Sequence, residues 1–350
     1  MPRIRSSGAK IRAAFAAVLM LAFFLPTTAS SALVTEKQDG ISFAAWWYDL
    51  FDGEPPEESM ANLADTGAGW VSIVPTWYQD NADTTRIGPT DNSVTDEGVI
   101  HMIQTAHDLG LSVMLKPHID LSDDFTEWRA TIGTHWKGRP AKWDRWFRSY
   151  RHFIFHFAEL AQANGVEQFS VGCELIGTTG RATRWREVVA GVRDRFSGTL
   201  TYASNWGGEE VGLAWWDAVD LIGVDAYYPL TDENDPTVQE LEDAWATPIQ
   251  TLSDLSAAWD DKPIIFTEVG YRSVDGTNRH PWDWVNDAPL DLQEQADCYE
   301  ALFGALWDQS WFGGLYIWDW SADPTVGGPT DKDFTPFSKP AEEVLRTWFA

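Results

Sequence analysis

The chain has 350 residues, of which 25 are Lys or Arg and 53 are Asp or Glu, so its formal net charge at pH 7 is -28. Nucleic-acid binding and stable binding to a lipid surface both call for an excess of basic residues, so we expect neither kind of partner. With 44% hydrophobic and 22% charged residues, the composition is that of a globular protein with a real core. The 21 Trp residues are unusual, and much of that indole must do more than fill a core.

The first 32 residues follow the three-part order of a secretory signal peptide. A basic segment ending at Arg12 precedes the apolar run Ala13–Leu25, and small residues follow, so we expect cleavage after Ala29 or Ala32. The alternative is an uncleaved membrane anchor, but the apolar run is shorter than the ~20 residues that a spanning helix needs. We therefore expect a secreted or periplasmic protein.

From residue 33 to the end, short runs rich in β-branched and aromatic residues alternate with longer amphipathic stretches. The runs predict strands at Ile41–Trp47, Trp70–Trp77, Ser112–Ile119, Gln168–Ile176, Thr199–Trp206, Leu221–Tyr228, Ile264–Tyr271 and Gly314–Trp320. The stretches predict helices at Glu57–Thr66, Asp96–Leu109, Trp143–Asn164, Arg184–Phe196, Val238–Trp259, Leu292–Gln309 and Pro340–Phe349.

This alternation predicts parallel strands joined by crossover helices, and its length matches an α/β fold of the (β/α)8 TIM barrel type. We expect residues 33–350 to form this barrel as a single catalytic domain. An open doubly wound sheet is the alternative, but it would usually carry a glycine-rich phosphate loop. The sequence contains neither GxGxxG nor GxxxxGKS/T, so we expect no nucleotide cofactor.

Two glutamates stand out because each follows a strongly apolar predicted strand at the end where a barrel places its active site. Glu174 follows the fourth strand and Glu268 the seventh. Cleaving a glycosidic bond requires one carboxylic acid and one carboxylate, and burial with mutual repulsion would separate the two pKa values. The alternative is that either Glu forms an ion pair at the rim, with Lys116 or Arg272, but two such residues favour catalysis.

The tryptophans support the same interpretation. Sugar rings have apolar faces that lie flat on indole while their hydroxyls bond to polar neighbours. Trp77, Trp206 and Trp318 lie at predicted strand ends, where such a platform would be. Tryptophans in predicted helices, such as Trp146, are expected in the core.

Other chemistries are less favoured. His118 and Asp120 could hold a metal ion, but the chain has only 7 His, so we expect no metal and no other cofactor. A serine nucleophile is disfavoured because no GxSxG motif is present. Cys173 and Cys298 are expected to be buried and free. Because Cys173 comes one residue before Glu174, it should point away from the side that Glu174 faces.

From about residue 40 to the C-terminus, the chain resembles a known family, glycoside hydrolase family 113. The motifs that carry the resemblance are Val74–Gln79, Lys116–His118, Gly172–Leu175, Tyr202–Trp206, Asp225–Pro229 and Thr267–Ser273. The family belongs to a clan of retaining barrel glycosidases with an acid/base on strand four and a nucleophile on strand seven. Its activity is on β-1,4-mannan.

The resemblance implies that Glu174 is the acid/base and Glu268 the nucleophile, with Tyr227 or Tyr228 hydrogen-bonded to the nucleophile. It also implies a subsite for the attacked sugar shaped by His118, Asn205 and Trp318. Residues in the matching motifs complete the predicted substrate-binding set with Lys116, Trp206 and Asp225.

One residue departs from the wider clan, in which many members have Asn directly before the acid/base to bind the sugar 2-hydroxyl. Cys173 stands there instead, and a thiol is a poor replacement. Another group, such as Asn205, must then hold that hydroxyl. The choice between mannose and glucose at the cleavage site therefore stays open.

We expect a monomeric, exported, retaining glycoside hydrolase that acts on a β-linked polysaccharide or oligosaccharide, with β-mannan preferred. The alternatives are β-glucan cleavage on the same scaffold, a carbohydrate-binding barrel without activity, and the metal hydrolase. A retaining pair predicts carboxyl groups about 5 to 5.5 Å apart.

Overall fold

The computed structural model describes residues 37–122 and 127–350, which lie in a compact unit that runs from Ala32 to Ala350. The predicted signal peptide, residues 1–32, lies outside the described residues. Among the described residues, no helix is both long enough and apolar enough to pass through a membrane.

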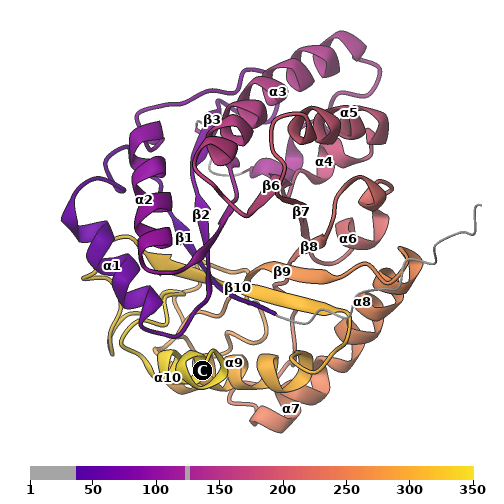
Figure 1. Cartoon of the computed structure of the whole chain (residues 1–350). Coiled ribbons are helices and arrows are strands. Elements are labelled where there is room, and N and C mark those ends of the chain that lie inside the picture. Colours follow the sequence, from indigo (N-terminus) through magenta and orange to yellow (C-terminus); the bar gives the residue numbers. More distant parts are fainter. Residues whose placement is uncertain (1–36, 123–126) are drawn as a thin grey trace, which may run out of the picture. The chain divides into compact units, whose positions relative to one another are not determined.

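Eight parallel strands close into a barrel with helices around its outside (Figure 1), which confirms the predicted (β/α)8 fold. Around the barrel the strand order is β1, β10, β9, β8, β7, β6, β4 and β2. In chain order the barrel strands are β1 (Gln38–Ala44), β2 (Trp70–Val74), β4 (Ser112–Leu115), β6 (Gln168–Cys173), β7 (Thr199–Asn205), β8 (Ile222–Asp225), β9 (Ile264–Val269) and β10 (Phe312–Ser321). Each predicted strand overlaps one of these. Pairing between β1 and β10, with Ile41 opposite Ile317, closes the barrel.

Two predicted strands are each broken in two by a proline. The backbone of Pro75 and Pro117 has no N–H to donate to the sheet, so β2 and β4 end before them. The chain continues as β3 (Thr76–Gln79) and β5 (His118–Leu121), which pair in a separate parallel sheet. His118 therefore lies beyond the end of its barrel strand, on the side where the active site of such a barrel forms.

The outer layer contains every predicted helix, although one predicted helix is divided into two. Its long helices are α1 (Glu54–Ala64), α2 (Asp96–Asp108), α3 (Pro140–Ala163), α5 (Ala182–Arg193), α7 (Val238–Ala244), α8 (Ala246–Ala258), α9 (Leu292–Leu306) and α10 (Pro340–Trp348). The predicted helix Val238–Trp259 is two helices that meet at Trp245. Pro248 explains the break, because its ring would clash with the carbonyl group four residues earlier if one helix continued.

Short helical segments occupy the loops between these elements. They are η1 (Arg129–Thr131), α4 (Ile176–Thr179), α6 (Glu209–Gly212) and η2 (Trp216–Ala218). Three of them, η1, α4 and α6, lie directly beside the ends of strands that carry candidate site residues.

Many tryptophans pack between the barrel and its helices. The indole rings of Trp185 and Trp215 stack with centroids 5.2 Å apart and planes 5° from parallel. The tryptophan side chains that are less than 2% exposed are Trp136, Trp146, Trp185, Trp215, Trp216, Trp245 and Trp320. A large share of the tryptophan content therefore belongs to the core, more than the composition suggested. Cys173 and Cys298 are buried and free, as predicted.

Candidate active site

Glu174 and Glu268 converge at the C-terminal end of the barrel. Glu174 directly follows β6, and Glu268 is the last residue but one of β9. Each places a carboxylate oxygen within 4.8 Å of Cys173 Sγ. The sequence-predicted pair is therefore assembled in one place, although its residues are separated by almost a hundred positions in the chain.

The Glu268 carboxylate is almost fully buried and has a donor on each oxygen. Lys116 Nζ donates to Oε1 at 2.5 Å, and the Tyr227 hydroxyl donates to Oε2 at 2.7 Å. His118 Nε2 lies 3.6 Å from Oε1. An ammonium group and a hydroxyl at these distances stabilise the charged form of a carboxylate and fix its orientation.

The Lys116 ammonium is surrounded by groups that compensate its burial. Nζ also donates to the Thr267 carbonyl at 3.1 Å, lies 4.0 Å from Asp225 Oδ1, and stands 5.3 Å from the centre of the Trp318 ring. Burial lowers the pKa of Lys116, but the nearby carboxylates of Glu268 and Asp225 outweigh it, so the net pKa is raised. Lys116 is therefore a fixed positive charge under the site.

Asp225 completes this buried group from β8. Its Oδ1 accepts from the Thr267 hydroxyl at 2.7 Å and its Oδ2 from the Cys173 thiol at 3.3 Å. Burial, and then the charge of Glu268, raise the pKa of Asp225 well above its usual range. The Asp225 side chain therefore holds Thr267 and Cys173 in place.

Glu174 has different surroundings. Asn205 Nδ2 donates to Oε1 at 2.6 Å, and Arg129 Nη1 donates to Oε2 at 3.3 Å. Burial and the charge of Glu268 raise the pKa of Glu174 to about 7, against the lowering effect of Arg129. Near neutral pH a large fraction of Glu174 thus carries a proton. The neighbouring carboxylate of Glu268 accepts hydrogen bonds from Lys116 and Tyr227. An acid and a carboxylate at the same pH are what glycosidic bond cleavage needs.

A buried chain of hydrogen bonds joins the ends of β6 and β7 behind Glu174. The Leu175 N–H donates to the Tyr202 hydroxyl at 2.8 Å, and that hydroxyl donates to Glu209 Oε1 at 2.8 Å. Glu209 Oε2 accepts from the Asn205 N–H at 2.7 Å. Burial raises the pKa of Glu209 to about 8. This chain fixes the backbone on both sides of the contact between Asn205 and Glu174.

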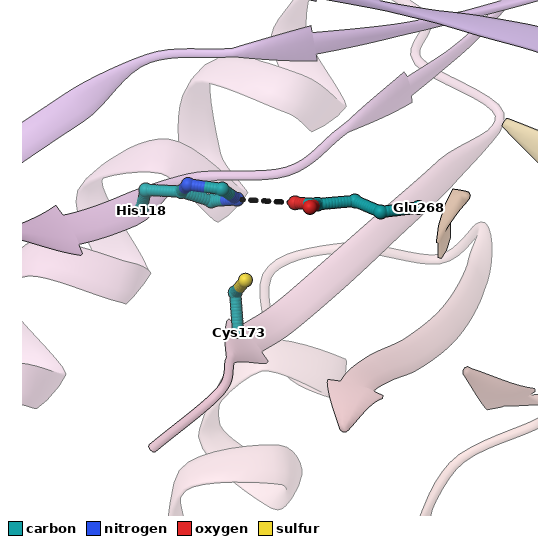
Figure 2. Close-up of side chains that lie close together, drawn as sticks. All are labelled: His118, Cys173 and Glu268. Carbon is teal, nitrogen blue, oxygen red and sulfur yellow. Dashed lines mark ion pairs between the residues drawn. The ribbon is translucent and has the colours of Figure 1, made fainter. Parts of the chain in front are cut away.

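Cys173 points into the site, so the prediction that it faces away is wrong. Figure 2 shows His118 and Glu268 pointing toward each other, with the Cys173 thiol directed at the space between them. The cause is an irregularity in β6, whose register with β7 shifts between Ser170 and Cys173. The φ of Glu174, 52°, is left-handed, so the alternation also fails at the next residue. Side chains alternate in direction only while a strand stays regular and extended.

The ligand atoms of His118, Cys173 and Glu268 lie within 4.8 Å of one another, close enough for a metal ion to be considered. Two positive charges oppose that use. Lys116 Nζ is hydrogen-bonded to Glu268, and Arg129 Nη1 lies 3.5 Å from Cys173 Sγ. A divalent cation would have to displace both groups or bear their repulsion, so this donor set does not fit a resident metal.

The two tyrosines after β8 have different partners, and Trp206 and Trp318 lie beside different residues of the site. The Tyr228 hydroxyl donates to Glu210 Oε1 at 3.3 Å, so the tyrosine on Glu268 is Tyr227. The Tyr228 ring packs against the edge of Trp206, with centroids 5.8 Å apart. Trp318 faces the imidazole of His118, with planes 7° apart and centroids 6.2 Å apart.

Trp77 is buried against the helical layer. Its ring packs on α3, with centroids 5.6 Å from Phe153 and 5.2 Å from His156. Alternation along β3 turns Trp77 and Gln79 toward the helices and puts Tyr78 on the opposite face. Burial, and then Asp120, raise the pKa of Tyr78 to about 12. The prediction that Trp77 belongs to the sugar platform is therefore wrong.

Arg129, from η1, is the main site residue that the sequence did not single out. Its side chain is 13% exposed, and Nη2 donates to Asp120 Oδ2 at 3.1 Å while Nη1 reaches Glu174. It lies in a long connection without a motif, so no sequence signal marked it. Glu209 was missed for another reason, because acidic residues at the start of a helix are usually exposed.

Two comparisons with known proteins identify the same family. The model of glycoside hydrolase family 113 matches residues 48–339. A solved structure of the family 113 β-mannanase from Alicyclobacillus acidocaldarius, in complex with ManMIm, is 31% identical, with a TM-score of 0.81, over 91% of this chain and 99% of that chain. A complex of a family 113 β-1,4-mannanase is also 31% identical, with a TM-score of 0.78, over 90% of this chain and 99% of that chain.

More distant structures share the fold alone. A β-glucuronidase from Ruminococcus gnavus, in complex with D-glucuronic acid, is 14% identical, with a TM-score of 0.61, over 90% of this chain and 50% of that chain. A comparison with the curated proteins gives no match.

The buried ammonium group of Lys116 should contribute to stability. Replacing Lys116 by Met should lower the free energy of unfolding by about 3 to 5 kcal/mol at pH 7, because it leaves buried carboxylates without their counter-charge. Urea unfolding followed by Trp fluorescence measures this change. The control is Lys332→Met, which removes a solvent-exposed ion pair with Asp287 and should change little. Equal stabilities of Lys116→Met and the wild type would show that Lys116 does not balance the buried charges.

Proposed function

This chain belongs to glycoside hydrolase family 113 and is a glycoside hydrolase, and from that premise we propose that it is a secreted, retaining enzyme that cleaves β-1,4-linked mannan. Glu174 acts as the acid/base and Glu268 as the nucleophile. The observation that carries this proposal is the contrast between the two glutamates, one with a pKa raised to about 7 and the other bound by Lys116 and Tyr227.

In the first step, Glu174 donates its proton to the glycosidic oxygen while Glu268 attacks the anomeric carbon. The leaving sugar departs with that proton, and a covalent glycosyl-enzyme ester forms on Glu268. Asn205 and Arg129 hold the Glu174 carboxyl from two sides, which fixes the direction of proton transfer. Lys116 and Tyr227 hold the attacking carboxylate in the same way.

The second step follows from the coupling between the two groups. The charge of Glu268 is one of the causes that raise the pKa of Glu174. Once Glu268 is esterified, that charge is gone, so the pKa of Glu174 falls and the carboxyl is left as a carboxylate. It can then take a proton from water, which attacks the anomeric carbon and releases the sugar with its original configuration.

His118 and Trp318 are proposed to hold the sugar that is attacked. Burial, and then the charges of Arg129 and Lys116, lower the pKa of His118 well below its usual range, so its imidazole is neutral. Among the described residues, its Nε2 has no hydrogen-bond partner, which leaves that atom for a sugar hydroxyl. Trp318 lies beside it with a flat face for the ring.

The preference for mannan is supported by the β-mannanases that this chain resembles over nearly its whole length. One observation keeps β-glucan as a second candidate. The Cys173 thiol already donates its hydrogen bond to Asp225, so it is not a donor for the sugar 2-hydroxyl. The configuration at that hydroxyl is what distinguishes mannose from glucose. A barrel that only binds carbohydrate is less well supported because both glutamates are present and converge. Secretion rests on the sequence of residues 1–32, and the monomeric state on the sequence prediction.

The substrate and the stereochemistry can be tested together. The purified protein should release reducing sugar from locust-bean mannan faster than from barley β-glucan, equally with and without EDTA. Proton NMR of the first product should show the β-anomer, because two displacements restore the configuration. Glu268→Ala should abolish release, whereas Glu159→Ala, at an exposed position, should not. Release of the α-anomer first, or loss of activity with EDTA alone, would contradict the proposal.

The pH profile offers a separate prediction. Arg129 lowers the pKa of Glu174, so Arg129→Met should raise it and keep the acid protonated to higher pH. The alkaline limb of kcat/KM should then move upward by about one pH unit. The control is Arg186→Met, which removes a surface pair with Asp217 and should leave the limb in place. An unmoved or lowered limb in Arg129→Met would show that Glu174 does not govern it.

A further inference from the structure

Glu209 is a buried glutamate that takes no direct part in the proposed reaction. It is the first residue of α6, which lies beside the ends of β7 and β8 (Figure 1), and it is 9% exposed. The chain turns sharply between β7 and α6 at Gly207 and Gly208, whose φ angles of 80° and 141° suit glycine best. A buried carboxyl group is costly unless its oxygens accept hydrogen bonds, so the partners of Glu209 indicate its role.

The hydrogen bonds of Glu209 belong to a ring of contacts that begins and ends at Glu174. Oε2 of Glu209 accepts from the Asn205 N–H at 2.7 Å, and the Asn205 side-chain amide donates to Glu174 at 2.6 Å. Oε1 accepts from the Tyr202 hydroxyl at 2.8 Å, and that hydroxyl accepts from the N–H of Leu175, the residue after Glu174, at 2.8 Å. Glu209 therefore holds the surroundings of Glu174 from two directions.

Glu174 requires such support because its own backbone is strained. Its φ of 52° is left-handed, a conformation that costs a residue with a side chain about 1 to 2 kcal/mol. Such a conformation persists only where the surrounding structure holds it. The Glu174 N–H donates to the Ala203 carbonyl at 2.8 Å, and the Leu175 N–H donates to Tyr202. These two contacts fix the peptide groups on both sides of Glu174, and so the direction in which its side chain leaves the backbone.

The next residue, Glu210, shows that burial alone does not produce this arrangement. Glu210 is 2% exposed and lies on the same short helix. Its carboxylate accepts from the Gly208 N–H at 2.7 Å and from the Tyr228 hydroxyl at 3.3 Å, so it stabilises the turn and the segment after β8. Glu209 is the one of the two that binds the neighbours of Glu174.

We propose that Glu209 is a positioning residue for proton transfer by Glu174. By holding the backbone of Leu175 and Asn205, it keeps the Glu174 carboxyl directed at the glycosidic oxygen. A general acid typically contributes about 10²- to 10⁴-fold to a rate, and only within hydrogen-bond reach of the atom that it protonates. A small displacement of Glu174 is therefore costly. This inference rests on the proposed function, because it concerns the step assigned to Glu174.

Two substrates that differ in their need for a proton separate positioning from general damage. Phenyl β-mannobioside releases a basic phenolate that requires protonation, whereas 2,4-dinitrophenyl β-mannobioside releases an anion stable enough to leave without a proton. In Glu209→Ala, the ratio of kcat/KM for the phenyl substrate to kcat/KM for the dinitrophenyl substrate should fall about tenfold, because kcat/KM reports the step in which the leaving group departs. Absorbance of the released phenols measures both rates. A protein that is merely less stable loses both rates in the same proportion.

The neighbouring positions supply matched variants. Glu210→Ala removes an equally buried carboxylate from the same helix and should leave the ratio unchanged. Glu209→Gln keeps an acceptor for the Asn205 N–H and should lose less of the ratio than Glu209→Ala. Tyr202→Phe breaks the link to Leu175 and should lower the ratio as well. Glu209→Gln and Tyr202→Phe carry the test if Glu209→Ala does not fold.

An unchanged ratio in the Glu209 variants and in Tyr202→Phe, or an equal fall in Glu210→Ala, would overturn the positioning role. A wild type that hydrolyses neither substrate would contradict the proposed function itself.

Discussion

The buried ion pair between Lys116 and Glu268 is the interaction on which the site depends. Each charge would be costly in the protein interior without the other, and the 2.5 Å contact, together with Tyr227, compensates both. Glu268 also acts on Glu174: burial raises the pKa of Glu174 to about 7, and the charge of Glu268 adds to that effect. One buried contact thus links the stability of the barrel end to the proposed division of roles between the two carboxyl groups.

The fold places the other residues around this contact through breaks in its regular elements. Pro75 and Pro117 end two barrel strands early, and His118 follows in a separate short sheet beside Glu268. The register shift between Ser170 and Cys173 turns Cys173 toward the same space, where its thiol reaches Asp225. Regular strands position the glutamates, and the irregular residues after them position their partners.

The barrel was predictable from the sequence because alternating apolar runs and amphipathic stretches are local signals of strand and helix. The two glutamates were predictable because carboxylates directly after apolar strands are costly unless used. What failed depended on direction or on contacts distant in sequence. Trp77 faces α3 because it is in phase with Val71 and Ile73, whose side chains belong to the same core cluster. Arg129 and Glu209 acquire their roles only when three strand ends and their loops come together.

The central claim is that Glu268 forms a covalent bond to the sugar while Glu174 transfers protons. Incubation with 2-deoxy-2-fluoro-β-mannosyl fluoride, which slows breakdown of such an intermediate, followed by mass spectrometry of the intact protein and its peptides, tests it most directly. The account predicts a single fluoromannosyl adduct on Glu268 that disappears on dialysis with a mannan oligosaccharide. An adduct on Glu174, or inactivation absent while mannan is still hydrolysed by inversion, would contradict it.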